Sequence, residues 1–191
     1  MLAVRLASVI LAVLAASPAS AAASEELWPL LRAGGHVVLM RHTVTTPGVG
    51  DPPGFRPGEC ATQRNLTDAG REDARRIGAA FRARGIPVGR VRSSPWCRCL
   101  ETARLTFGRA ESWDALSNLY GKPGLEPERE ATLRATLSEG PSDGNLVLVT
   151  HGSTILAITG QHPAPGELFV VTPEGRGRFR LAGRIPVSAI P

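Results

Sequence analysis

Cysteine, lysine and long apolar runs are scarce in this chain of 191 residues. The spacing of its three cysteines suggests no fourth ligand, which argues against a zinc site, and we expect no metal and no other cofactor. No apolar run approaches the roughly 20 residues of a membrane-spanning helix. The Gly-x-Ser-x-Gly motif of many serine hydrolases is also absent, and Gly152-Ser153-Thr154 does not supply it. These absences argue against a zinc enzyme, an integral membrane protein and a serine hydrolase of that type.

The first 23 residues have the layout of a cleavable signal peptide. A positive charge at Arg5 precedes an apolar run from Leu6 to Ala16, and small residues follow at Ala19-Ser20-Ala21 and Ala21-Ala22-Ala23. An uncleaved membrane anchor is the alternative, but the small residues favour cleavage. We therefore predict a periplasmic or secreted protein without stable membrane insertion after cleavage.

The remaining residues, 24–191, are expected to form a single domain, since no Gly/Ser linker or repeat divides them. The formal net charge of the whole chain is +5, and only one of its 22 basic residues is a lysine, Lys122. The arginines are scattered among acidic residues rather than gathered into a basic stripe, so nucleic-acid binding is not predicted. A modest positive surface favours a small anionic substrate.

The cysteines predict a disulfide if the chain reaches an oxidising compartment. One bond and one free thiol is the simplest arrangement for three cysteines. Cys60 is expected to pair with Cys97 or with Cys99. A bond between Cys97 and Cys99 is less favourable, because a Cys-x-Cys pair closes a very tight ring at a predicted helix start.

Apolar runs alternate with helical patterns along the chain. Strands are predicted at 36–40, 88–93, 145–150, 168–172 and 179–185; helices are predicted at 25–32, 67–84, 95–107, 126–139 and directly after His151-Gly152, with a short, weak element at 112–119. This pattern predicts an α/β fold, a three-layer sandwich with a largely parallel central sheet and helices on both faces. Ligands of such sheets bind beyond the carboxyl ends of the strands, where His42 and His151 both fall. The loop at 43–65 and residues near 110–125 are expected to wall the pocket.

Three motifs stand in order along the predicted strand ends. They are Arg41-His42, Ser94-Pro95-Trp96-Cys97-Arg98 followed by Thr102-Ala103, and Val149-Thr150-His151-Gly152. The ordered set resembles the histidine phosphatase superfamily, whose best-known member is phosphoglycerate mutase. Leu66-Thr67, Gly70 and Ala74 also match the family's Leu-Thr-x-x-Gly-x-x-x-Ala stretch. The resemblance covers about residues 36–160 and implies a phosphoglycerate-mutase-like fold.

The resemblance implies a role for each residue, and the chemistry gives each role a reason. His42 is the expected nucleophile: one bare ring nitrogen attacks phosphorus, and water later hydrolyses the phosphohistidine. Arg41 and Arg98 supply planar forks for the phosphoryl oxygens, and His151 is expected to donate a further hydrogen bond. The amide of Gly152, at a helix start, and the guanidinium of Arg64 are further candidate substrate contacts. His36 and His162 fit an ordinary structural role.

Two positions depart from the family pattern. Thr43 stands where members usually have Gly after Arg-His, and we expect its side chain to contact the substrate and narrow the approach to His42. Asn118, in Leu116-Ser117-Asn118, stands where many members have the Glu that protonates the leaving group, and an amide cannot release a proton at neutral pH. Asp114 is the first choice as donor, with Asp51 and Glu59 as alternatives. Otherwise the leaving group needs no strong acid.

The sequence thus predicts a phosphomonoester hydrolase of the histidine acid phosphatase type, acting in the periplasm on a small or envelope-derived phosphate ester. Mutase activity is less favoured, because the chain is short and export separates it from cytoplasmic sugar phosphates. Export also argues against hydrolysis of protein phosphohistidine. The alternative from another class is a phosphate-ester-binding module with little or no turnover, suggested by the missing acid.

Overall fold

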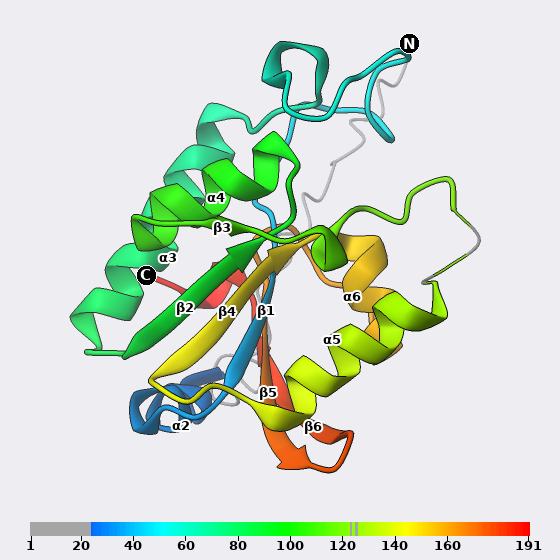
Figure 1. Cartoon of the computed structure of the whole chain (residues 1–191). Coiled ribbons are helices and arrows are strands. Elements are labelled where there is room, and N and C mark those ends of the chain that lie inside the picture. Colours follow the sequence, from blue (N-terminus) through cyan, green and yellow to red (C-terminus); the bar gives the residue numbers. More distant parts are fainter. Residues whose placement is uncertain (1–23, 123, 125) are drawn as a thin grey trace, which may run out of the picture.

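The computed structural model of the chain has a six-stranded sheet with helices on both faces (Figure 1). It describes residues 24–122, 124 and 126–191. The predicted signal peptide lies outside the described residues. The strands are β1 (Val37–Arg41), β2 (Val88–Ser93), β3 (Glu111–Ser112), β4 (Asn145–Thr150), β5 (Leu168–Gly175) and β6 (Arg178–Ile185), in the spatial order β3-β2-β4-β1-β5-β6. The first four strands in that order are parallel, whereas β5 and β6 pair antiparallel. The predicted fold class is confirmed.

The helices divide between the two faces of the sheet. They are α2 (Leu27–Ala33), α3 (Asp68–Ala83), α4 (Cys97–Phe107), α5 (Pro127–Glu139) and α6 (Gly152–Thr159), with short 3-10 turns at Cys60–Thr62, Asp114–Leu116 and Val187–Ala189. In Figure 1, α2, α3 and α4 lie on one side of the sheet, and α5 and α6 lie on the other. Successive side chains of a strand point to opposite faces. Val38 and Met40 of β1 accordingly join the core under α2, α3 and α4, and Val37 and Leu39 join the core under α5 and α6.

Local sequence signals place the ends of several elements. Thr67 caps α3, its side chain accepting a hydrogen bond from the Gly70 amide at 3.0 Å. The helix predicted from Pro95 begins two residues later, at Cys97, because Trp96 is still in an extended conformation. The weak element predicted at 112–119 is in fact a two-residue strand followed by a 3-10 turn. No helix in the described ranges is long and apolar enough to cross a membrane.

A disulfide ties the long loop after β1 to the start of α4. Cys60 and Cys97 are bonded, which is one of the two predicted pairings, and Cys99 is a buried free thiol. The Gln63 side chain strengthens the same junction by accepting a hydrogen bond from the Cys97 amide at 3.0 Å. The loop at 43–65 is therefore fixed beside Arg98, the residue after Cys97.

Candidate active site

His42 lies at the carboxyl end of β1, in the centre of the sheet. Arg41, the last residue of β1, pairs in register with Thr150 of β4, and the His42 amide donates to the Thr150 carbonyl at 3.0 Å. Because β1 and β4 are parallel neighbours, His42 and His151 emerge side by side. Their ring centroids are 5.5 Å apart. The sheet topology thus brings together two histidines separated by more than one hundred residues.

The ring of His42 is arranged as a nucleophile requires. Its Nδ1 donates to the Thr43 carbonyl at 2.9 Å, which leaves Nε2 as the bare nitrogen. Burial lowers the pKa of His42 to about 3, opposed by the Thr43 carbonyl and reinforced by the positive charges of Arg98, Arg41 and Arg64. The imidazole is therefore neutral at physiological pH and keeps its lone pair.

A cavity of about 360 Å³ opens over His42. Its lining combines three arginines, three histidines and the loop and helix residues around them: Arg41, His42, Gly48, Val49, Gly50, Arg64, Arg98, Asn118, Tyr120, His151, Gly152, Ser153, Leu156 and His162. Among the described residues, no Asp or Glu lines this cavity. The cavity is thus a cationic site, suited to an anion carrying more than one negative charge.

The three cavity arginines retain unused hydrogen-bond donors. In the described part of the chain, six buried side-chain nitrogen or oxygen atoms have no partner, and three of them are the Nε atoms of Arg41, Arg64 and Arg98. Buried polar groups are nearly always paired, so a group of unpaired donors around one cavity calls for an explanation. Oxygen atoms of a bound phosphoryl group would satisfy them.

Asp51 forms a buried ion pair with the guanidinium of Arg98. The two side chains form a buried bidentate pair with N–O distances of 2.6 and 3.2 Å, and Trp96 Nε1 and the Arg64 amide also donate to the carboxylate. Burial by itself raises the pKa of Asp51, but the hydrogen bonds from Arg98 and Arg64 outweigh it and lower that pKa overall. Asp51 is therefore ionised, and the structure does not support its use as a proton donor. Glu59, the other alternative, is exposed and pairs with Arg56.

His151 is fully enclosed and already hydrogen-bonded. Its Nε2 lies 2.7 Å from Ser94 Oγ, and its Nδ1 lies 3.5 Å from Arg98 Nη2. Since an arginine nitrogen can only donate, Nδ1 accepts and Nε2 donates to Ser94. Burial is the main cause that lowers the pKa of His151 well below its usual value. Electrostatic interactions with His42 and Arg98 lower this pKa further. A hydrogen bond from His151 to a phosphoryl oxygen, as expected from the sequence, would require it to exchange the Ser94 contact.

Two of the predicted site residues lie away from the cavity. Thr43 is buried behind it, where its hydroxyl meets that of Thr102 at 3.3 Å, so it does not narrow the approach to His42 as expected. Asp114 is exposed and lines a separate cavity of about 700 Å³ with Lys122 and Glu126. None of the described residues that line this separate cavity also lines the cationic one. The expectation that Asp114 protonates the leaving group is therefore not supported.

Other predicted residues do lie on the cavity. Arg41, Arg64, Arg98 and Gly152 all line it. A Cβ built on Gly152 would lie 3.3 Å from His162 Nε2 and 3.4 Å from Arg41 Nε, so the glycine permits the close approach of these two side chains. Asn118, at the position of the family's Glu, also faces the cavity.

His162 is the site residue that the sequence analysis missed. It was interpreted as structural, yet it lines the cavity beside Arg41. The sequence does not indicate the direction of β5. In the structure β5 runs antiparallel to β1, with Leu168 opposite Met40. The loop before Leu168 must therefore lie at the same sheet edge as His42. An apolar strand pattern carries no direction, so this placement was not predictable from periodicity.

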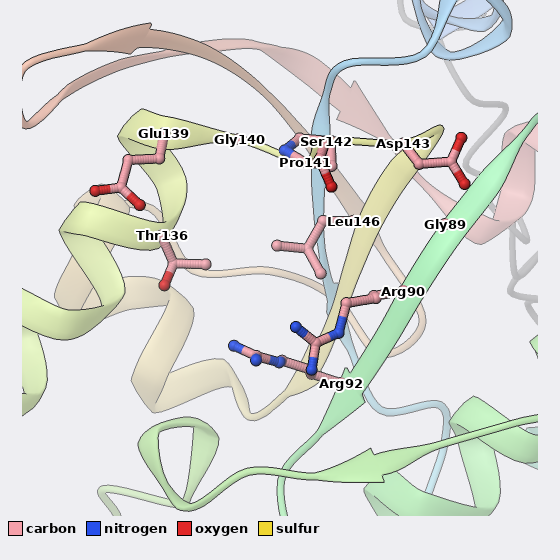
Figure 2. Close-up of a pocket in the computed structure, with 10 residues that line it drawn as sticks. All are labelled: Gly89, Arg90, Arg92, Thr136, Glu139, Gly140, Pro141, Ser142, Asp143 and Leu146. Carbon is pink, nitrogen blue, oxygen red and sulfur yellow. The ribbon is translucent and has the colours of Figure 1, made fainter.

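A third cavity contains arginines but lacks the other features of the candidate active site. It measures about 320 Å³ and lies near the amino ends of β2 and β4, beside α5 (Figure 2). Arg90 and Arg92 enter it, but both pair with Glu111, at 2.7 and 3.7 Å. No histidine or cysteine of the part of the chain that the structure describes lines it. Burial raises the pKa of the remaining thiol, Cys99, to about 12, which argues against a thiolate nucleophile.

Comparison with known proteins points to one family. Residues 37–120 match the model of the histidine phosphatase superfamily (branch 1). No curated protein matches the chain. The fold is shared with the putative phosphohistidine phosphatase SixA from Agrobacterium tumefaciens, with 22% identity, a TM-score of 0.52, and coverage of 80% of this chain and 97% of that one.

Two further structures share the fold. The protein histidine phosphatase SixA complexed with tungstate has 17% identity and a TM-score of 0.58, covering 82% of this chain and 99% of that one. A phosphoserine phosphatase from Entamoeba histolytica, in complex with phosphoserine, has 15% identity and a TM-score of 0.59, and the match again covers 82% of this chain and 99% of that one. The family match includes Arg41-His42 and Arg98 and the fold is common to all three structures, which together support the histidine phosphatase superfamily.

Proposed function

We propose that this protein is a phosphomonoester hydrolase that works through a phosphohistidine on His42. The observation that carries the proposal is a neutral, buried histidine with a bare Nε2, set in a cavity lined by three arginines and no carboxylate. His42 attacks phosphorus, the ester oxygen leaves in line on the opposite side, and water then cleaves the N–P bond. Arg41, Arg64 and Arg98 neutralise the phosphoryl oxygens as charge spreads over them.

The leaving group receives little help from the protein in this mechanism. Asn118 occupies the place of the family's acid, and its Oδ1 already accepts a hydrogen bond from Ser153 at 2.9 Å. The proposal therefore favours esters whose leaving group departs without a strong acid, and a histidine acid phosphatase type in the broad sense of a histidine nucleophile.

The proposed place of action is the periplasm or the exterior, on a small or envelope-derived ester. The Cys60–Cys97 bond supports it, because disulfides persist in oxidising compartments. Amino-terminal sequencing of protein recovered from the periplasmic fraction tests it: a chain that starts near residue 24 is expected, and recovery only from the cytosol would contradict it.

The test of activity is release of inorganic phosphate from a panel of esters by the purified protein and by His42→Ala. Turnover that disappears in the variant is expected. The alternative, a phosphate-ester-binding module, is favoured by the missing acid in the cavity lining. Tight binding of phosphate or vanadate without turnover of any ester would reject the hydrolase and support the module.

A further inference from the structure

Apolar side chains gather at the mouth of the cationic cavity. Four large hydrophobic residues in the described part of the chain are exposed, and three of them line this cavity: Val49, Tyr120 and Leu156, which are 79%, 60% and 42% exposed. The fourth, Leu30 of α2, is 39% exposed and lies outside it. Scattered exposed hydrophobics need no explanation, but a cluster on one functional cavity does.

The three residues come from three separate segments that meet at this mouth. Val49 belongs to the loop after β1, Tyr120 follows the 3-10 turn at Asp114–Leu116, and Leu156 lies on α6. The first two segments touch: a Cβ added to Gly50 would lie 2.7 Å from Tyr120 Cε1. The Tyr120 ring thus rests on the backbone next to Val49. These two side chains and Leu156 line the same cavity and are here called the apolar rim.

The chemistry directs one part of the substrate to this rim. His42 is 3% exposed and attacks from the buried floor of the cavity, whereas the rim residues are exposed, as are Gly48 and His162 of the same lining. In-line displacement places the leaving group on the side of phosphorus opposite the nucleophile. The group esterified to the phosphate therefore lies toward the mouth, against Val49, Tyr120 and Leu156.

The side-chain oxygens of two polar residues beside the rim, Asn118 and Ser153, are already engaged within the protein. Asn118 Oδ1 accepts from Ser153 Oγ at 2.9 Å and from the Tyr120 amide at 3.1 Å, and Ser153 Oγ accepts from the Leu119 amide at 3.2 Å. A site built to recognise hydroxyl groups would present unpaired polar groups there. His162 is the other polar side chain near the mouth, on the wall next to Arg41.

We propose that the preferred substrate is a phosphate monoester of an apolar group whose oxygen leaves without a strong acid, such as a phenol, and that its hydrocarbon part packs on the apolar rim. The inference rests on the proposed function and specifies its substrate class. Each fully buried methylene is worth about a fourfold change in affinity, and a rim that stays open to water on one side gives about half that free energy, or roughly twofold per methylene.

Binding of straight-chain alkylphosphonates tests the proposal, because they carry the phosphoryl group but cannot be hydrolysed. From ethyl- to hexylphosphonate, four methylenes are added, so the dissociation constant measured by calorimetry should fall by roughly 16-fold. Leu156→Asn should remove much of this dependence. Leu30→Asn is the matched control: a similarly exposed leucine on another helix, whose replacement should leave the dependence unchanged.

The outcomes separate the inference from the function on which it rests. An affinity that is flat or falls with chain length, or tighter binding of dihydroxypropylphosphonate than of the hexyl compound, would overturn the apolar substrate class even if esters are hydrolysed. A chain-length dependence equal in Leu156→Asn and in the wild type would overturn the assignment to the rim. Failure of the hydrolase would appear in the turnover assay, which phosphonate binding does not involve.

Discussion

Replacing Asp51 with asparagine tests whether the buried carboxylate supports the Arg98 guanidinium. The side chains of Asp51 and Arg98 are 4% and 1% exposed, and they share two hydrogen bonds. Asp51→Asn keeps the shape but removes the negative charge, so Arg98 is left as an uncompensated buried cation near Arg41 and Arg64. Breaking such a pair costs about 3–5 kcal/mol, and the amide oxygen still accepts one bond, so we expect the lower end, about 3 kcal/mol.

Thermal unfolding with and without inorganic phosphate is the assay. A loss of about 3 kcal/mol lowers the Tm of a domain of this size by roughly 6–12 °C. Phosphate should restore part of the loss, because it supplies another anion to Arg98, and its stabilising effect should be larger in Asp51→Asn than in the wild type. The matched control is Asp68→Asn, which breaks an ion pair of a fully exposed carboxylate with Arg71 and should barely change the Tm. A Tm for Asp51→Asn within about 2 °C of the wild type would refute the reasoning.

Three further predictions concern the disulfide, the nucleophile and the missing acid. Cys60→Ser should destabilise the protein by up to about 4 kcal/mol, since the bond closes a loop with a sequence separation of 37; urea unfolding of the variant and of reduced wild type, each against oxidised wild type, measures it, and midpoints equal to that of the oxidised protein would contradict it. Because burial holds the pKa of His42 at about 3 rather than 6.5, kcat/KM should not fall through protonation of His42 as the pH drops from about 7 to 4; an acid limb near pH 6.5 that shifts with this residue would refute it. Asn118→Glu should raise kcat/KM for alkyl phosphates by at least about tenfold while changing nitrophenyl phosphate little, with Asn118→Gln as control; no gain for the alkyl esters would mean that the acid is not what limits them.

Strand placement was predictable because the signal is local. The run Asn145–Thr150 is buried at every position, as expected of a central strand covered on both sides, and its apolar pattern gave its bounds. The predicted bounds of β2, and within one residue those of α3 with its Thr67 cap, also agree with the structure. The positions of His42 and His151 at the carboxyl ends of strands followed from these elements together with the order of the motifs.

The rest of the site depends on contacts that the sequence does not encode locally. The Asp51–Arg98 pair joins residues 47 positions apart across a loop without periodicity, so nothing marked Asp51 as a partner of Arg98. Thr43 turns inward because Thr102 of α4 lies behind it, which sequence spacing cannot show. The apolar rim likewise arises only when three distant segments meet. Loop geometry and strand direction, rather than secondary structure, set these limits.

The most direct measurement of the central claim is trapping of the covalent intermediate. The protein is mixed with a phosphate ester that it turns over, quenched within the first turnovers and digested, and the peptide containing His42 is analysed by mass spectrometry under conditions that preserve phosphohistidine. The account predicts up to one phosphoryl group per chain, located on His42, absent from His42→Ala and reduced at steady state by added nucleophiles that speed its cleavage. Continued turnover with no phosphoryl group on His42, or with the label on another residue, would contradict it.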